Sequence, residues 1–250
     1  MSTKIILNPK FENLRQFVEN LHLRFDEEGT VIYDKRNVIK VIPVNDLEVN
    51  IKAFAVPNIV NRFVYGNFRL SKARRSYEYA TILLEKKVNT PEPIAYIEIK
   101  KGFLFSQSFY LCIHEKFDGM MRELQRGKLQ GRGIFLTQFA RFTADMHEKE
   151  VLHEDYSPGN ILYKKKDGDY DFYLVDLNRM SFGKVTIEEG CRSLRRLWGS
   201  DEMIRYIASE YAKTRGFDTD KCIELTMHYH DEFWREFSRR HPEDKPYIED

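Results

Sequence analysis

The residues best suited to catalysis lie in residues 151–160 and at the end of the apolar run that follows them. His153, Asp155 and Asn160 have the spacing His-x-Asp-x-x-x-x-Asn, and the apolar run at 172–175 ends on Asp176. Together these are an acid that accepts a hydroxyl proton, an amide oxygen after it and a second acid at a strand end. Such a set can hold Mg²⁺ and a nucleoside triphosphate while a hydroxyl attacks the terminal phosphate.

Each of these residues also has a simpler interpretation. Asp155 is a common turn residue beside a Ser-Pro-Gly turn, and a single histidine such as His153 is more often a structural hydrogen-bonding group. The order of the parts is more informative: a helix, the motif, a short strand, a turn, a second short strand and then the acid. Because structural context confirms a motif, this order favours a phosphotransfer site with residues 153–160 as its catalytic loop.

A lysine and a glutamate upstream complete the set of candidates. Residues 47–54 alternate as a strand, which places Lys52 among apolar residues. A helix is predicted near 71–87, with Ser71 as its cap and Glu78 beside its apolar stripe. A lysine that grips phosphates needs an acidic partner, and Glu78 is the candidate. An exposed strand lysine and an ordinary helix-surface glutamate are the alternatives.

The pattern of apolar residues divides the chain into a β-rich part and a helical part. Strands are predicted within residues 21–54, including one at 21–25, and at 94–99, 103–105 and 109–114. Helical periodicity follows at 133–149, 186–198, 201–214 and 219–239. We therefore expect an N-lobe at 1–114, a linker at 115–119 and a helical C-lobe at 120–250. The linker backbone could hold an adenine edge, with Glu115 and Phe117 as nucleotide-binding candidates, although a plain hairpin exit fits the same residues.

The overall composition disfavours several classes of protein. With 250 residues, 42% hydrophobic and 32% charged, the chain suits a soluble globular protein of one domain or two small lobes. A formal net charge of +1 provides no general attraction to nucleic acid. Three widely spaced cysteines, none in a C-x-x-C pair, suggest neither a disulfide framework nor a zinc site. Since there is no signal-peptide pattern and no stretch of about 20 apolar residues, we expect a cytoplasmic protein.

The order of these parts resembles the protein-kinase-like fold, an α+β fold with a β-rich N-lobe that carries one main helix, a linker and a helical C-lobe. More narrowly, the sequence resembles the lipopolysaccharide core kinases, a bacterial family that phosphorylates Kdo or heptose on the lipid A-core. The resemblance covers residues 20–200 approximately. The matching segments are 50–54 around Lys52, 73–78 ending at Glu78, Asn-Thr-Pro-Glu-Pro-Ile-Ala at 89–95, the loop at 153–162, and Asp176 with Leu-Arg-Arg-Leu at 194–197.

The resemblance implies a role for each candidate. Asp155 is the implied catalytic acid/base, and Asn160 and Asp176 are the implied Mg²⁺ ligands. Lys52 would hold the phosphates of ATP, with Glu78 as its partner. The implied cofactors are ATP and Mg²⁺, and the implied acceptor is a lipid-linked sugar, Kdo-lipid A or core. Such an acceptor implies peripheral contact with the cytoplasmic face of the inner membrane.

Three features depart from the protein-kinase pattern. No G-x-G-x-x-G precedes the Lys52 strand, so Lys35, Arg36 and backbone amides of the 34–37 hairpin are the candidates to cover the phosphates. Asp176 is followed by Leu-Asn rather than Phe-Gly, and no Ala-Pro-Glu segment comes after it. A protein substrate docked on an activation segment is therefore not expected.

Other classes of function fit parts of the sequence. A soluble small-molecule kinase of the aminoglycoside or choline type shares the same loop. A pseudokinase scaffold often lacks one residue of the catalytic set, whereas all five are present here: Lys52, Glu78, Asp155, Asn160 and Asp176. A nucleic-acid-binding module is supported by only four arginines, Arg192, Arg195, Arg196 and Arg205. These arginines equally suit a solvated helix face or contact with an anionic lipid surface. Of these, Arg195 and Arg196 are candidates either for acceptor contact or for a structural role. The sequence does not determine the oligomeric state or which sugar hydroxyl reacts.

Overall fold

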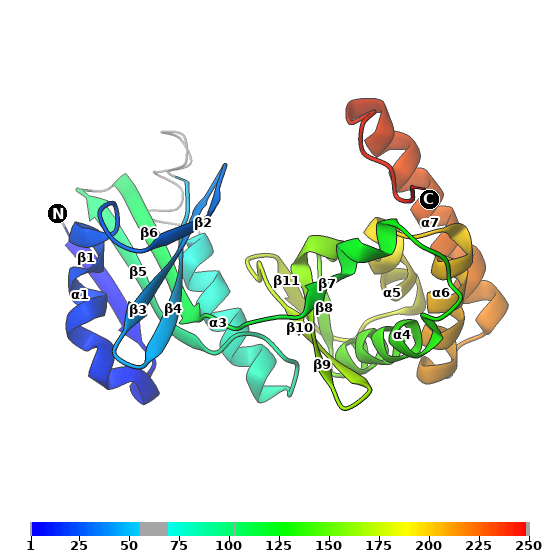
Figure 1. Ribbon diagram of the computed structural model, residues 1–250, viewed down its shortest axis with the longest axis horizontal. Coiled ribbons are helices and arrows are strands. Elements are labelled where there is room, and N and C mark those ends of the chain that lie inside the picture. Colours follow the sequence, from blue (N-terminus) through cyan, green and yellow to red (C-terminus); the bar gives the residue numbers. More distant parts are fainter. Residues whose placement is uncertain (1, 56–69, 103, 249–250) are drawn as a thin grey trace. The chain divides into compact units, whose positions relative to one another are not determined.

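The computed structural model describes residues 2–55, 70–102 and 104–248. Its packing divides the chain into an N-terminal unit, Met1–Lys116, and a C-terminal unit, Phe117–Asp250. The course of the chain through both units can be followed in Figure 1.

The N-terminal unit is built on a six-stranded antiparallel sheet in the order β1-β5-β6-β4-β3-β2. Its strands are β1 (Ser2–Leu7), β2 (Thr30–Asp34), β3 (Val38–Val44), β4 (Leu47–Ala53), β5 (Pro93–Lys101) and β6 (Leu104–Ile113). The alternation predicted around Lys52 is present, because Val49 and Ile51 are fully buried while Asn50 and Lys52 are partly exposed. Lys52 thus lies on β4, a central strand held on both sides.

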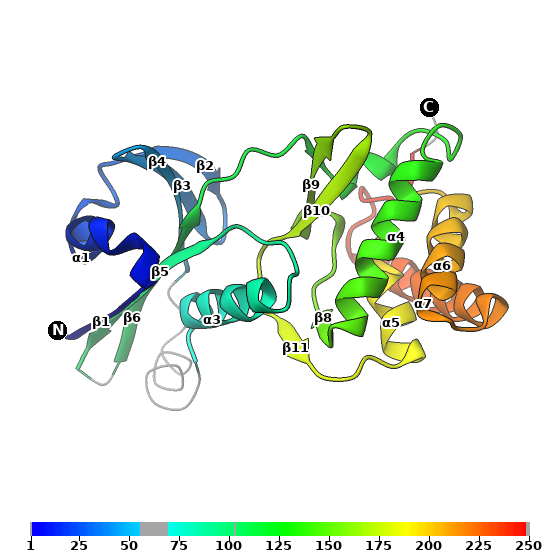
Figure 2. The ribbon, with the colours of Figure 1, turned by 90° about the horizontal axis from the view of Figure 1, so that it is seen from below.

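Two helices cover opposite faces of this sheet (Figure 2). Helix α1 (Arg15–Arg24) follows the 3-10 helix η1 (Pro9–Leu14) and packs on the face that carries Ile51 and Ile97. Helix α3 (Lys72–Glu85) begins after Ser71, whose side chain accepts a hydrogen bond from Arg74 N, as its sequence predicts. It lies on the other face, where its Tyr77 ring packs against that of Tyr96 at 5.5 Å.

The strand predicted at 21–25 is wrong, since these residues end helix α1. Leu14, Val18, Leu21 and Phe25 are buried together in the core. Their spacing of three and four residues marks one face of a helix, and it outweighs the short alternation that suggested a strand. The buried Lys40 ammonium stabilises the end of this helix, because it donates to the carbonyl oxygens of Phe25 at 2.5 Å, Asp26 at 3.1 Å and Glu28 at 3.2 Å.

The two strands predicted at 103–105 and 109–114 form one strand, β6, and Phe103 lies outside the described residues. The polar residues between them suggested a break, but Ser106 and Ser108 are buried within the sheet. Gln107 and Ser108 pair with Ile99 and Glu98 of β5. Pairing with the neighbouring strand therefore overrides the weak strand preference of these residues.

The C-terminal unit is largely helical, as predicted. Its helices are η2 (Met121–Gln125), α4 (Gly133–Glu148), η3 (Pro158–Asn160), α5 (Ile187–Ser193), η4 (Leu194–Arg196), α6 (Asp201–Arg215) and α7 (Thr219–Arg240). Its strands are β7 (Gly119–Met120), β8 (Val151–His153), β9 (Ile161–Lys166), β10 (Asp169–Leu174) and β11 (Met180–Phe182). Phe139 of α4 is fully buried, in ring contact with Tyr156 of the catalytic loop and Phe172 of β10. Helix α4 therefore packs directly against the loop and against the strand that leads to Asp176.

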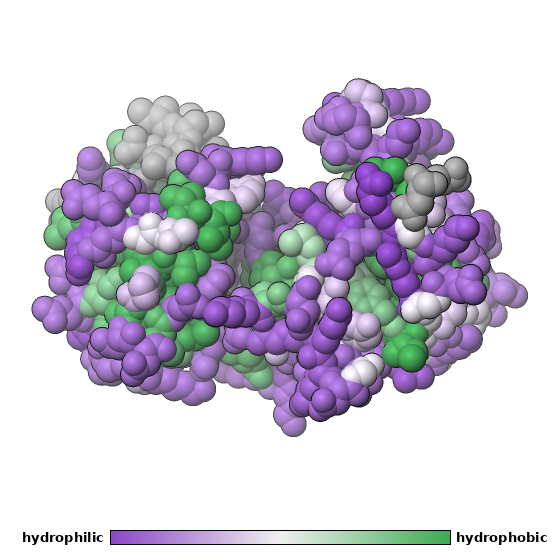
Figure 3. All heavy atoms as spheres, viewed as in Figure 1, coloured by the Kyte–Doolittle hydropathy of each residue, from purple (hydrophilic) through white to green (hydrophobic). Residues whose placement is uncertain are grey.

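The face of the molecule seen in Figure 3 is mostly hydrophilic, with apolar side chains exposed over the sheet of the N-terminal unit. The exposed strand β2 contributes Val31, Ile32 and Tyr33, which are 49%, 50% and 43% exposed. Among the described residues, no helix has both the length and the apolar character needed to cross a membrane.

Candidate active site

The catalytic loop connects strand β8 to strand β9. Strand β8 leads into the loop and pairs with β11, with His153 opposite Met180. The loop then closes through a single 3-10 turn, η3, before β9 begins at Ile161. Since β11 follows Asp176 by only a few residues, this pairing holds the start of the loop next to the segment that carries Asp176.

His153 links the loop to the end of β10. Its ring is 1% exposed, and its Nδ1 accepts the backbone N–H of Asp155 at 3.1 Å. Its Nε2 lies 3.1 Å from the carbonyl oxygen of Val175. A carbonyl can only accept and a backbone N–H can only donate, so the ring is neutral with its proton on Nε2. Burial lowers the pKa of His153, which agrees with this neutral form. His153 therefore has the structural hydrogen-bonding role that its sequence left open.

Asn160 is fixed by the loop itself. Its side-chain Nδ2 donates to the backbone oxygen of Asp155 at 2.9 Å. The backbone carbonyl oxygen of Asn160 accepts a hydrogen bond from Val175 N at 3.0 Å. Because the backbone oxygen of Asp155 can only accept, the NH₂ end of the amide must face it. The amide oxygen of Asn160 is therefore presented at the opposite end, as a metal ligand requires.

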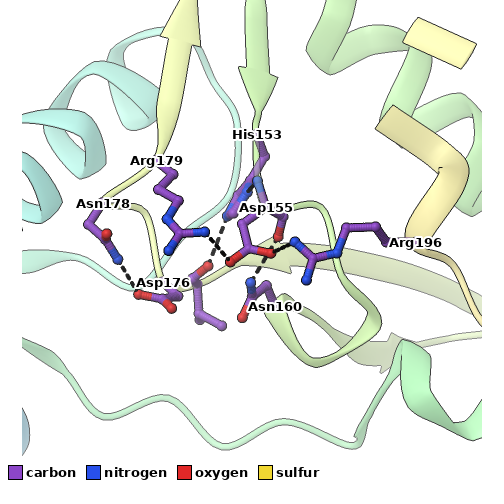
Figure 4. Close-up of polar contacts among 8 residues, drawn as sticks. His153, Asp155, Asn160, Asp176, Asn178, Arg179 and Arg196 are labelled. Carbon is purple, nitrogen blue, oxygen red and sulfur yellow. Dashed lines mark hydrogen bonds and ion pairs between the residues drawn. The ribbon is translucent and has the colours of Figure 1, made fainter. Parts of the chain in front are cut away.

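Asp176 follows β10 in an unusual conformation. Its φ is +56°, in the left-handed region that few residues other than glycine adopt. Its Oδ1 accepts a hydrogen bond from Asn178 Nδ2 at 2.5 Å, which orients the carboxylate. Asp155, Asn160 and Asp176 are thus gathered around one small region through the contacts of Val175 and His153 (Figure 4).

The oxygen donors of Asn160 and Asp176 fit Mg²⁺. Mg²⁺ prefers oxygen ligands and is usually held by one or two protein groups, with phosphate oxygens and water completing its shell. One carboxylate and one amide oxygen on adjacent segments meet that need.

Two arginines contact the carboxylate of Asp155, a role that the sequence indicated for neither of them. Arg196 Nη1 binds Oδ1, and Arg179 Nη1 lies 3.4 Å from Oδ2. The Asp155 side chain is only 19% exposed, so the arginines fix the orientation of a largely buried carboxylate. The expectation of a solvated helix face is therefore wrong for Arg196, whereas Arg195 binds the backbone oxygen of Arg192.

The N-terminal unit carries Lys52 and Glu78. The Lys52 Nζ lies 5.2 Å from the centroid of the Phe54 ring, at the end of β4. Glu78, partly exposed on α3, accepts a hydrogen bond from Arg74 Nε at 2.7 Å. Arg74 comes one helical turn earlier, so this is an i,i+4 ion pair of a familiar kind. The pairing of Glu78 with Lys52 stays a prediction.

The N-terminal unit also carries three further nucleotide-binding candidates. Lys35 and Arg36 are exposed between β2 and β3, and Arg36 lines a hollow of about 210 Å³ with Asn37 and Phe54. Glu115 is partly buried at the end of the N-terminal unit.

Phe117 begins the C-terminal unit. Its ring packs edge-on against that of Tyr173 at 5.2 Å, and the ammonium of Lys164 lies over both rings. This cluster gives Phe117 a defined place, and its contact with adenine stays a prediction.

Comparison with known protein families gives a match over residues 48–200 to the model of the lipopolysaccharide kinase (Kdo/WaaP) family. The matched stretch contains Lys52, Glu78, Asp155, Asn160 and Asp176. The chain belongs to the lipopolysaccharide kinase (Kdo/WaaP) family. Membership makes it a phosphotransferase of the kinase type, for which ATP is the expected phosphoryl donor.

Among solved structures, the chain is similar to WaaP in complex with acyl carrier protein. The TM-score is 0.62 at 14% identity, over 94% of this chain and 98% of that chain. This similarity confirms the predicted protein-kinase-like fold with its β-rich and helical lobes. A search among curated proteins found no match.

Proposed function

We propose that this protein transfers the terminal phosphoryl group of ATP to a hydroxyl of a Kdo or heptose residue in the inner core of lipopolysaccharide. The observation that supports it best is the family match over residues 48–200, which contains all five residues of the catalytic set. The geometry of the C-terminal unit supports the same chemistry, because its loop carries Asp155 and Asn160, and the segment after β10, which carries Asp176, is hydrogen-bonded to that loop.

In the proposed reaction, Asp155 accepts a hydrogen bond from the attacking sugar hydroxyl and receives its proton. The hydroxyl oxygen forms a bond to the γ-phosphorus, and the bond from that phosphorus to the β,γ-bridging oxygen breaks, so that ADP leaves. Arg196 and Arg179 act as positioning residues, because they fix the direction of the Asp155 carboxylate. Positioning of this kind is the main contribution of a protein to phosphoryl transfer.

Asn160 and Asp176 would hold Mg²⁺, which neutralises charge on the phosphates when it is bound. In the N-terminal unit, Lys52 would grip the phosphates and Glu78 would hold Lys52. Exchange of Glu78 from its ion pair with Arg74 to Lys52 would accompany nucleotide binding. Lys35 and Arg36 would cover the phosphates from the β2–β3 hairpin, and Glu115 and Phe117 would lie at the adenine.

A lipid-linked acceptor would bring the protein to the cytoplasmic face of the inner membrane as a peripheral protein. The similar solved structure holds WaaP together with acyl carrier protein. An acyl carrier protein is therefore a candidate partner for this chain, and co-purification of the two proteins tests it.

The proposed acceptor is tested by incubating the purified protein, ATP and Mg²⁺ with Kdo-lipid A, heptose-extended core or a panel of soluble acceptors, and analysing the products by mass spectrometry. We expect a gain of one phosphate on the lipid-linked sugar alone. Transfer to an aminoglycoside or to choline, with none to the lipid-linked sugars, would replace this proposal with a soluble small-molecule kinase.

A further inference from the structure

A cavity of about 320 Å³ adjoins the catalytic loop within the C-terminal unit. Residues 157–159 of the loop form one side of it, and aromatic side chains of α7 form another. Its volume falls in the range of roughly 300–1,000 Å³ that is usual for small-ligand sites. None of the residues given a role in nucleotide or metal binding lines it.

Arg196 connects this cavity with the proposed catalytic carboxylate. Its guanidinium binds Asp155 and also lies 5.5 Å over the ring of Phe233, which lines the cavity. A ligand in the cavity would therefore be separated from Asp155, the proposed proton acceptor, only by the side chain of Arg196.

A second guanidinium lies against the loop itself. An added Cβ at Gly159 would be only 2.8 Å from Nη2 of Arg122, so glycine is what lets Arg122 lie against the backbone there. The same guanidinium is 5.5 Å over the Trp198 ring. Among the residues that the structure describes, no carboxylate forms an ion pair with Arg122, although Asp244 also lines the cavity.

The lining combines positive charge with flat apolar surfaces. It has two guanidinium groups and one carboxylate, and its aromatic residues are Trp198, Phe233, Trp234 and Phe237. Guanidinium groups bind carboxylate and phosphate groups through paired hydrogen bonds. An aromatic ring offers a surface on which the C–H face of a sugar ring packs. A sugar that carries an anionic group matches both parts of this lining.

We infer that this cavity is an acceptor subsite, which binds an anionic sugar residue through Arg122 and the Trp198 ring. The inference rests on the proposed function, since it names where that acceptor is held. A hydroxyl of the bound acceptor would then be directed to Asp155, and Arg196 would separate the cavity from the Asp155 carboxylate.

Intrinsic fluorescence measures binding here directly, because the chain has two tryptophans and both line the cavity. The full chain, with Mg²⁺ and a non-hydrolysable ATP analogue, is titrated with free Kdo, its methyl ester and a sugar phosphate. We expect a saturable change with Kdo and a weaker response to the ester, which lacks the negative charge. The sugar phosphate distinguishes recognition of a phosphate from recognition of a carboxylate.

The test variant is Arg122→Gln, and the matched control is Arg141→Gln, which replaces an exposed arginine of α4. Loss of a charge-assisted pair should weaken Kdo binding about 10- to 100-fold in Arg122→Gln. It should also raise the KM for the acceptor more than it lowers kcat. The control should bind and turn over like the unchanged protein.

Two results would overturn the inference: no saturable fluorescence change with any anionic sugar, or equal affinity in Arg122→Gln and the unchanged protein. Failure of the proposed function gives a different pattern. In that case, the lipid-linked acceptor is not phosphorylated, yet the anionic sugar still binds in an Arg122-dependent way. Conversely, phosphorylation of the lipid-linked sugar with an unchanged acceptor KM in Arg122→Gln would refute the subsite alone.

Discussion

Replacement of His153 by leucine should separate the positioning of the catalytic loop from its chemistry. His153 touches no proposed substrate group, but it joins Asp155 N to the carbonyl oxygen of Val175, next to Asp176. The change to leucine keeps an apolar side chain in the buried space and removes both hydrogen bonds.

The magnitude follows from these two contacts. A buried donor or acceptor left without a partner costs about 1–3 kcal/mol, and part of this is recovered by the apolar burial of leucine. His153→Leu should therefore lower the free energy of unfolding by about 2–4 kcal/mol. Since small proteins are usually stable by about 5–15 kcal/mol, the variant should still fold. A displacement of Asp155 by about 1 Å should lower kcat on the order of 100-fold.

Urea unfolding and steady-state kinetics at neutral pH measure the two effects. His228→Leu is the matched control, because His228 is an exposed residue of α7, and it should change neither quantity appreciably. A His153→Leu protein with unaltered stability and kcat would show that the two hydrogen bonds do not hold the loop.

Three further predictions concern pH, metal and phosphate contacts. Burial lowers the pKa of His147 to about 3 from its ordinary 6.5. Between pH 3 and pH 6.5 the unfolded chain therefore binds a proton at His147 that the folded chain does not, so the stability of the fold rises with pH in this range. Acidification from pH 6.5 to 4.5 should therefore remove about 2 kcal/mol of stability through His147, and equal pH slopes in unfolding of His147→Gln and the unchanged protein would contradict this. Asp176→Ala should abolish the Mg²⁺ dependence of ATP binding in calorimetry, because it removes the proposed carboxylate ligand of the metal, whereas an unchanged dependence would reject that assignment. Lys52→Met and Glu78→Gln should each lower phosphotransfer, and the double variant should lose less than the sum of the two free-energy effects; full additivity would mean that they act independently.

Local patterns predicted the elements that carry the candidate residues. Alternation placed Lys52 on a strand, and the cap at Ser71 placed Glu78 on a helix, because each signal arises from neighbouring residues. The spacing of the catalytic loop likewise placed Asp155 and Asn160 around one turn.

The contacts that depend on distant residues were not predictable in this way. Arg196 lies 41 residues after Asp155, and nothing in the pattern around either residue indicates that they meet. Arg179 follows Asp176 by three residues, a proximity that could have drawn attention to it, but its contact with Asp155 depends on the pairing of β8 with β11. Helix α1 was missed because apolar and polar residues alternate by chance over residues 21–25. The helical spacing of its buried residues becomes visible only when the segment is read from Leu14 onward.

The most direct test of the central claim is phosphotransfer to Kdo-lipid A by Asp155→Asn, measured with γ-labelled ATP. The change keeps the size of the side chain and removes its ability to take the hydroxyl proton. We expect a rate lower by about 10²- to 10⁴-fold, with ATP binding retained. The control is Asp171→Asn, at an exposed position of β10, which should transfer phosphate at the unchanged rate. Transfer by Asp155→Asn at a near-normal rate would remove Asp155 from the mechanism and contradict the account of this site.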